Sequence, residues 1–367
     1  MKTYGRLLQI VPCAPGSNEG VGDYALKLAE RLRSDYEKET IFAAAVVTSV
    51  SRIENFDVVP LLATAEGECA NCHDIVLHYV NYGYQKRGIP AQLPPLLRRM
   101  RRICAGRLIT IFHELYASAP PWRSGFWLQP KQKSIAREIA QLSDACVVSS
   151  ETMRDLLQRL SPASKIAVHP VISTLGEPAL STDQFVRRDP HRWVIFGGTY
   201  LLQRSLKTFR DRLSVIPEAI APRELYVLGG SESATMRNDL GQIRGVTCHY
   251  HPAIEAGAAS EILSSCSFGW IDYFRQRNVP TATILKSGSF ASYCAHGVIP
   301  IFPREGSAIV LQGDQMPGPY FVESNRAHLP SLSDRAETSA RIHEWYRRNA
   351  SIEHLAKGVA TLFQLKS

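Results

Sequence analysis

Short apolar runs rich in β-branched residues recur along the chain, separated by stretches in which apolar residues return every three or four positions. In the first half these runs fall at residues 7–11, 41–47, 75–79, 108–112 and 145–148. Between the first two runs, one helical stripe predicts a helix, formed by Ala25, Leu28, Ala29 and Leu32. Strands that alternate with helices in this way predict a parallel sheet covered by helices.

The second half repeats this alternation, with strand-like runs at 193–198, 225–230, 246–250, 268–273 and 298–302. Between the halves, three prolines and Gly176 interrupt any regular pattern, which predicts a hinge at residues 170–180. A long helical region follows Asp334, and from Ile352 to Phe363 its apolar residues return every three or four positions. This last part is therefore predicted to pack on a domain surface.

The length of the chain agrees with two domains. Its 367 residues exceed the roughly 250–300 residues at which a single hydrophobic core stops growing. The pattern predicts an N-terminal domain over 1–172, a C-terminal domain over 173–340 and a C-terminal helical region over 341–367. The expected fold class is α/β, with two doubly wound domains and one cleft between them.

Basic residues are in excess, giving a formal net charge of +8 and a pI near 9.1. This charge favours anionic partners such as a sugar nucleotide or a lipid headgroup. A basic cluster is predicted to form either a solvated helix face or a contact with anionic lipid, and consists of Arg98, Arg99, Arg101 and Arg102. No recognition module for nucleic acid accompanies the charge, so no nucleic-acid partner is expected.

No apolar run reaches the about 20 residues of a transmembrane helix, and the N-terminus is too short for a secretory signal. A cytoplasmic protein is expected, with peripheral contact to the inner face of the membrane if the arginines bind lipid. The spacing Cys69-x-x-Cys72-His73 matches a haem attachment motif. Because there is no export signal and no second ligand pair, we interpret it as a coincidence and expect no metal and no cofactor.

Two segments that follow first-half strands are candidates for chemistry. The glycine-rich loop at 15–23 leads into a predicted helix whose free N–H groups can bind an anion, and it contains Gly20, Gly22 and Asp23. Its spacing is not G-x-G-x-x-G, and its acids argue against a simple phosphate cradle. His113 and Glu114 directly follow the 108–112 strand, where a histidine can bond a sugar hydroxyl, carry a proton or serve a structural role.

The second half contains two basic helix starts. Arg204 and Lys207 follow the 193–198 run closely enough to reach the same crevice at the carboxyl edge of the sheet. A second start precedes the helix predicted over 290–296. Each start alone is equally well explained as a helix cap or a solvated charge. Together they predict a diphosphate site formed by Gly198, Arg204, Lys207, Lys286, Ser287 and Ser289.

Six segments of the chain together resemble a known family. They are Glu19-Gly20-Val21-Gly22-Asp23-Tyr24, Phe112-His113-Glu114-Leu115-Tyr116, Ala295-His296-Gly297-Val298-Ile299-Pro300 and residues 78–84, 147–150 and 264–269. In these segments the chain resembles bacterial glycosyltransferases of the GT-B type. The resemblance implies two Rossmann-like domains facing across a cleft, with C-terminal helices that cross back to the first domain. It also implies that the diphosphate site holds the sugar donor, that His113 contacts the transferred sugar, and that the first glycine loop adjoins acceptor and donor.

Retaining members of this group often carry two glutamates eight positions apart, and the second binds the nucleotide ribose. The corresponding positions here are Ile284 and Ser292, neither of them acidic. The resemblance implies transfer of a hexosyl group, with retention, from a nucleoside diphosphate sugar to a hydroxyl of a polysaccharide, glycolipid or small molecule. Transfer without a metal is expected, because basic residues and helix-start N–H groups can stabilise the leaving diphosphate and no D-x-D-like metal pair stands out. Two alternatives stay open, a sugar-nucleotide epimerase on the same fold and a catalytically silent sugar- or nucleotide-binding protein.

Overall fold

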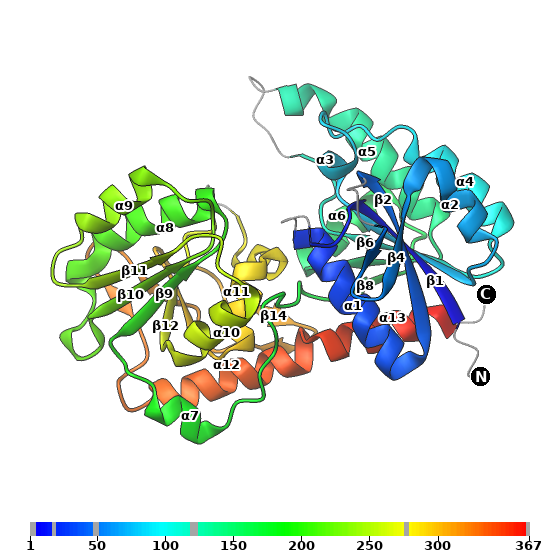
Figure 1. Ribbon diagram of the computed structural model, residues 1–367. Helices are drawn as coiled ribbons and strands as arrows, with labels where there is room; N and C mark the ends of the chain where they lie inside the picture. The colour runs from blue at the N-terminus through cyan, green and yellow to red at the C-terminus, as the bar shows by residue number, and fades with distance from the viewer. Residues whose placement is uncertain (1–4, 17–19, 47–50, 118–123, 275–278, 365–367) are drawn as a thin grey trace. The chain divides into compact units, whose positions relative to one another are not determined.

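The computed structural model describes residues 5–16, 20–46, 51–117, 124–274 and 279–364 (Figure 1). The chain divides into two compact units. Unit 1 comprises Met1–Pro170 and Ile352–Ser367, and unit 2 comprises Val171–Ser351. No helix within the described ranges is long and apolar enough to cross a membrane.

Unit 1 is built on an eight-stranded sheet in the order β3-β4-β2-β1-β5-β6-β7-β8, parallel except between β3 and β4. Its strands are β1 (Gly5–Cys13), β2 (Lys38–Val46), β3 (Arg52–Ile53), β4 (Phe56–Pro60), β5 (Asp74–Tyr79), β6 (Leu108–Phe112), β7 (Ala145–Val148) and β8 (Ile166–Val168). The five predicted runs form β1, β2, β5, β6 and β7. The apolar pattern does not predict the other three strands, which are two to five residues long.

The helices of unit 1 cover this sheet and bury their apolar stripes. They are α1 (Gly20–Tyr36), α2 (Leu61–Cys69), α3 (Asn81–Tyr84), α4 (Leu93–Ile103), α5 (Ser124–Leu142), α6 (Glu151–Leu160) and α13 (Ile352–Gln364). Helix α1 buries the stripe predicted from the sequence and packs against α13. The last helix of the chain thus returns to the unit that contains the first strand, as the sequence predicts.

Unit 2 contains a seven-stranded sheet in the order β11-β10-β9-β12-β13-β16-β17, parallel except at β17. Its strands are β9 (Arg192–Phe196), β10 (Glu224–Leu228), β11 (Thr247–His251), β12 (Phe268–Trp270), β13 (Ile299–Phe302), β16 (Tyr320–Val322) and β17 (Ala327–His328), and a separate hairpin joins β14 (Val310–Leu311) to β15 (Asp314–Gln315). The strand order reverses between β9 and β12. In open α/β sheets, ligands bind outside the carboxyl ends of the strands at such a switch point.

Helices cover the sheet of unit 2 as well. They are α7 (Thr182–Arg187), α8 (Thr199–Arg212), α9 (Ala234–Gly241), α10 (Ala256–Ser265), α11 (Gly288–Ala295) and α12 (Arg335–Asn349), with short 3-10 turns η1 (Leu213–Val215), η2 (Glu218–Ile220) and η3 (Thr281–Lys286). Helix α12 belongs to unit 2, whereas α13 belongs to unit 1. The expected fold class, two doubly wound parallel sheets in tandem, is confirmed.

The side chain of Tyr293 holds the switch point together. Strands β9 and β12 pair through only two residue pairs. Beyond them, the Tyr293 hydroxyl accepts a hydrogen bond from Phe196 N at 2.8 Å and lies 3.2 Å from Trp270 O, to which it can donate. Gly269 of β12 makes room for the ring, because a Cβ there would lie 2.7 Å from Tyr293 Cε2. A buried phenol therefore replaces part of the ladder between the two strands.

Candidate functional site

Open space lies outside the first turn of α8. Gly198 follows β9 and is the N-cap residue of the helix, and it is exposed. A Cβ added to Gly198 would meet no heavy atom within 4 Å, and the same holds for Gly288 in the first turn of α11. The first N–H groups of a helix have no partner within the helix and carry partial positive charge. Both helix starts can therefore be approached by an anion.

The start of α8 and the start of α11 are neighbours. A Cβ at Gly197 would lie 3.0 Å from the Ser289 hydroxyl oxygen, which brings the glycine pair after β9 next to the α11 start. The buried Ser287 hydroxyl caps α11 by accepting a hydrogen bond from Phe290 N at 3.3 Å. The structure thus brings Gly198, Ser287 and Ser289 together at the switch point, and Ser287 already serves as a helix cap.

Arg204 joins α8 to the segment after β12. Its Nε donates to the carbonyl oxygen of Asp272 at 2.6 Å, and its Nη2 donates to the same oxygen. Asp272 N donates to Ser205 Oγ at 3.0 Å. Burial raises the pKa of the Asp272 carboxyl, although Arg204 and Arg304 act in the opposite direction. Asp272 therefore positions Arg204. Asp272 is absent from the site residues predicted above, although an acid two residues after a strand is a recognisable signal in the sequence.

Lys207 and Lys286 are both exposed, and neither forms an ion pair with another described residue. Lys207 lies in the third turn of α8, and Lys286 ends η3 immediately before the N-cap of α11. Their ammonium groups are free to meet an anion from solvent. The two lysine side chains can turn toward a bound anion, whereas Arg204 is held in place by Asp272.

The two positions where retaining relatives often carry glutamate are buried. Ile284 and Ser292 are both 0% exposed. The Ser292 hydroxyl forms a hydrogen bond with the Ser173 hydroxyl at 3.2 Å. Neither side chain can reach a ribose without rearrangement of the core, so a carboxylate grip from these positions is absent.

In unit 1, His113 belongs to a chain of polar side chains that runs across the neighbouring strands β1, β5 and β6, with Gln9 and His78 buried and His113 partly buried. His113 Nε2 lies 3.2 Å from His78 Nδ1, and His78 Nε2 lies 2.8 Å from Gln9 Oε1. The ring of Tyr24 meets the His113 ring edge to face, at 4.8 Å between centroids. Sequence reasoning singles out His113 but neither Gln9 nor His78 as site residues. The sequence feature that could have identified Gln9 and His78 is that each is a polar residue inside an otherwise apolar strand.

Burial keeps this histidine pair uncharged. Burial lowers the pKa of His113 to about 4. Burial also lowers the pKa of His78 well below its ordinary value, and the neighbouring His113 lowers it further. At neutral pH both rings therefore have one donor and one acceptor nitrogen. His113 can orient a hydroxyl by hydrogen bonding, but it does not act as a cation.

Acidification should destabilise unit 1 through His113. Because its pKa is about 4 in the folded state, the unfolded chain takes up the proton first. Stability is complete above about pH 6.5 and is lost as pH falls toward 4, by up to about 3 kcal/mol. Thermal melting from pH 7.5 to 4.5 should show a shallower loss for His113→Gln than for the wild type. The same change at exposed His73, in the same unit, should keep the wild-type slope, and equal slopes in all three proteins would contradict the assignment.

The predicted glycine loop of unit 1 is held by Asp23. Its Oδ1 accepts a hydrogen bond from Gly16 N at 3.3 Å. Gly22 permits close packing, since a Cβ there would lie 3.1 Å from Pro15 Cα, whereas Gly20 faces open space. Residues 17–19 of the loop lie outside the described ranges. Glu114 is exposed, beside His113.

Most of the predicted basic cluster on α4 is neutralised within unit 1. Arg98 pairs with Glu138, Arg99 with Glu66 at 2.8 Å, and Arg101 with Asp144 at 2.7 Å. Among the described residues, exposed Arg102 alone of the four forms no ion pair. Contact with anionic lipid stays a prediction that the paired acids make weaker.

The cysteines are free thiols. Six of the eight are buried, including Cys69 and Cys72 of the haem-like motif. Within the part of the chain that the structure describes, no group of three or more histidines, cysteines or acids could hold a metal ion.

No family model matches the chain, and no curated protein is similar to it in sequence. Solved structures match in fold. A glycosyltransferase from Rickettsia africae has a TM-score of 0.58 at 11% identity, covering 99% of this chain and 98% of that one. Trehalose-6-phosphate synthase from Burkholderia multivorans has a TM-score of 0.60 at 11% identity, and the match covers 99% of this chain and 98% of that one. An Escherichia coli structure described as trehalose-6-phosphate bound with UDP-2-fluoro glucose has a TM-score of 0.57 at 11% identity, and the match covers 99% of this chain and 100% of that one.

These matches extend over nearly the whole of each chain, so both units take part in them. The chain therefore has the GT-B fold of two Rossmann-like domains. The resemblance inferred from sequence segments is confirmed at the level of the fold.

Proposed function

We propose that this protein is a glycosyltransferase that moves a hexosyl group from a nucleoside diphosphate sugar to a hydroxyl acceptor. The observation that carries the proposal is the meeting of two open helix starts, at Gly198 and Ser289, at the switch point of a unit with Rossmann-like topology. A diphosphate is the ligand that two adjacent helix N-termini favour. The GT-B fold of the chain agrees with this chemistry.

In this proposal unit 2 binds the donor and unit 1 the acceptor. The diphosphate receives N–H groups from the starts of α8 and α11, with Lys207 and Lys286 adding positive charge. As the glycosidic bond breaks, negative charge develops on the leaving diphosphate, and preorganised donors stabilise that charge. Arg204, fixed on Asp272, contributes to the same field.

His113 and Glu114 of unit 1 are proposed to contact the reacting sugar. Neutral His113 offers a hydrogen bond that orients a hydroxyl, and exposed Glu114 offers a carboxylate to a hydroxyl proton. Gly20, Gly22 and Asp23 are proposed to line the approach of acceptor and donor. Retention of the anomeric configuration rests on the resemblance alone, and proton NMR of the first-formed product tests it.

Transfer is expected to proceed without a metal, because lysine, arginine and helix N–H groups supply the charge at the diphosphate. Dialysis against EDTA should leave the initial rate unchanged, and added Mg²⁺ or Mn²⁺ should not raise it. A loss of activity that either ion restores would contradict this expectation.

A thermal-shift screen with UDP-, GDP-, ADP- and TDP-sugars tests the donor, since a ligand that binds only the folded state raises the melting temperature. We expect one nucleotide series to raise it and Lys286→Ala to weaken that ligand about tenfold, as loss of one charge contact does. The exposed Lys165 of unit 1, changed to alanine, provides the control. A screen with no shift, confirmed by calorimetry, would overturn the proposal.

A sugar-nucleotide epimerase is the second candidate. A putative UDP-N-acetylglucosamine 2-epimerase from Listeria monocytogenes matches with a TM-score of 0.50 at 11% identity, covering 83% of this chain and 80% of that one. Epimerised nucleotide sugar formed without acceptor would favour this candidate. Binding of a nucleotide sugar without turnover under any condition would favour a catalytically silent binding protein. This alternative is specific because Ile284 and Ser292, which are buried, replace the two glutamates that retaining members often carry.

Contact with anionic lipid is proposed only for helix α4. Glycosyl transfer is proposed to take place on the cytoplasmic side of the membrane. Sedimentation with vesicles that contain anionic lipid tests this. Binding that Arg102→Gln reduces would support lipid contact by the exposed arginine.

A further inference from the structure

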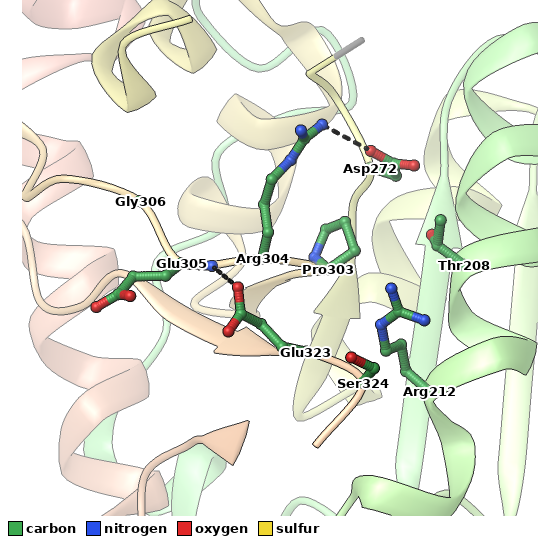
Figure 2. A pocket seen from close by; sticks show the side chains of 9 residues that line it. All are labelled: Thr208, Arg212, Asp272, Pro303, Arg304, Glu305, Gly306, Glu323 and Ser324. Atoms are coloured by element: carbon green, nitrogen blue, oxygen red, sulfur yellow. Dashed lines mark hydrogen bonds and ion pairs between the residues drawn. The ribbon is translucent and has the colours of Figure 1, made fainter. Parts of the chain in front are cut away.

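A cavity of about 720 Å³ lies in unit 2 and is lined by none of the residues predicted to bind the diphosphate (Figure 2). Its walls are the second half of α8 and the segments that follow β12, β13 and β16 at the carboxyl edge of the sheet. The volume falls within the about 300–1,000 Å³ that is usual for small-molecule sites. We call this cavity the Arg212 pocket, lined by Thr208, Arg212, Asp272, Arg304, Glu323 and Ser324, among others.

Arg212 gives this pocket a positive charge that acts on the Asp272 carboxyl but forms no ion pair within 4 Å among the described residues. Its Nε is buried and donates no hydrogen bond to any described residue. A second guanidinium lies in the same wall, since Arg304 Nη2 is 3.8 Å from Asp272 Oδ1 and donates to Phe274 O. A buried donor without a partner implies a missing ligand or solvent molecule. Two arginines on one cavity favour a phosphate, which guanidinium groups bind with paired hydrogen bonds.

Acceptor groups face the same space. The Asp272 side chain is only 7% exposed, and its Oδ1 accepts no hydrogen bond from the described residues. Glu323 binds Arg326 at 2.7 Å, and Glu305 binds the same arginine. In Figure 2, Asp272, Glu323 and Arg212 border one space. A ligand hydroxyl can donate a hydrogen bond to Asp272 Oδ1, and a carboxylate oxygen that is already ion-paired, such as those of Glu323, can accept a further one.

We propose that the Arg212 pocket binds a hexose monophosphate. Its phosphate would lie against Arg212 and Arg304, and its ring hydroxyls would donate to Asp272 and Glu323. Thr208 and Ser324 add hydroxyls to the wall. The proposal goes beyond glycosyl transfer and does not depend on it, because the pocket and its charges exist whether or not unit 2 binds a nucleotide sugar.

The arrangement also discriminates among phosphates. Inorganic phosphate fills a small part of the volume and brings no hydroxyl group of a sugar ring to Asp272 Oδ1, the carboxylate oxygen that accepts no hydrogen bond from the described residues. A nucleoside diphosphate brings additional negative charge toward the carboxylates of Asp272, Glu305 and Glu323, which repel it. One phosphate joined to a polyhydroxylated ring satisfies both walls.

Calorimetry on the full chain, with no nucleotide present, tests the proposal. The probes are glucose 6-phosphate and glucose 1-phosphate, with inorganic phosphate and glucose as comparisons. We expect at least one hexose phosphate to bind about tenfold more tightly than phosphate, and glucose to give no heat. Arg212→Met should weaken the hexose phosphate at least about tenfold. Arg210→Met is the matched control, because Arg210 lies on the same helix and donates to Gln242 Oε1 at 2.7 Å.

Equal affinity in Arg212→Met and the wild type would overturn the proposal, as would phosphate binding as tightly as the sugar phosphates or no binding by either sugar phosphate. The melting temperature of ligand-free Arg212→Met shows whether the variant is folded. A crystal structure of the wild type with glucose 6-phosphate needs no variant. Phosphate within hydrogen-bond distance of Arg212 supports the proposal, and phosphate bound elsewhere overturns it.

Discussion

Replacing Gly198 by aspartate is expected to weaken binding of the nucleoside diphosphate sugar strongly, without destabilising unit 2. Aspartate is a better N-cap than glycine, and its charge suits a helix N-terminus. A side chain at Gly198 meets no atom within 4 Å, so the substitution fits. The same carboxylate would occupy the proposed diphosphate position, where like charges about 4 Å apart repel by about 4 kcal/mol near a protein surface. Affinity should fall about 100-fold or more.

Calorimetry with the nucleotide sugar found by the screen measures this loss, and the melting temperature reports stability. Gly257→Asp is the matched control. Gly257 is exposed in the first turn of α10, a Cβ there also meets nothing, and the charge change is the same. Unchanged affinity in Gly198→Asp would remove the start of α8 from the binding site.

Tyr293→Phe should cost unit 2 about 2–3 kcal/mol of unfolding free energy. The missing hydroxyl leaves Phe196 N without its acceptor and Trp270 O without its donor, both at the switch point. Buried polar groups without partners cost about 1–3 kcal/mol each. Urea unfolding followed by tryptophan fluorescence suits the measurement. The tryptophans that are fully buried among the described residues, Trp193, Trp270 and Trp345, all lie in unit 2.

Tyr250→Phe separates this effect from the loss of any phenol hydroxyl. The Tyr250 hydroxyl donates to Ser231 O at 2.9 Å in an exposed position. Its removal should change stability by no more than about 0.5 kcal/mol. A similar small change for Tyr293→Phe would show that water or another group takes over its role.

The sequence predicts most of the sheet strands because buried parallel strands are continuous apolar runs. Every residue of β6, Leu108–Phe112, is buried, and the run is visible without any structure. β3 is too short to leave such a signal. The switch point can be placed only once the strand order is known, because sequence pattern does not report which strands are neighbours.

For the site, sequence reasoning locates the helix starts but not their partners. Gly198 and Ser289 are recognisable as a strand end and a helix start, yet their proximity depends on the tertiary fold. Arg204 illustrates the limit, since its charge suggests an anion site while its contacts lead to Asp272. The Arg212 pocket combines residues from α8 and three strand ends, which no local motif connects.

Unit 1 is closed by the final helix of the chain. Leu355, Ala356 and Val359 of α13 are buried there, and α13 packs on α1. During translation α13 is synthesised only after the whole of Val171–Ser351. Until then, the surface of α1 that α13 covers in the folded unit stays uncovered. At about 5–20 residues per second this delay is about 10–40 s. For that time the nascent N-terminal unit exposes apolar surface, so its biogenesis, more than that of unit 2, should depend on chaperones.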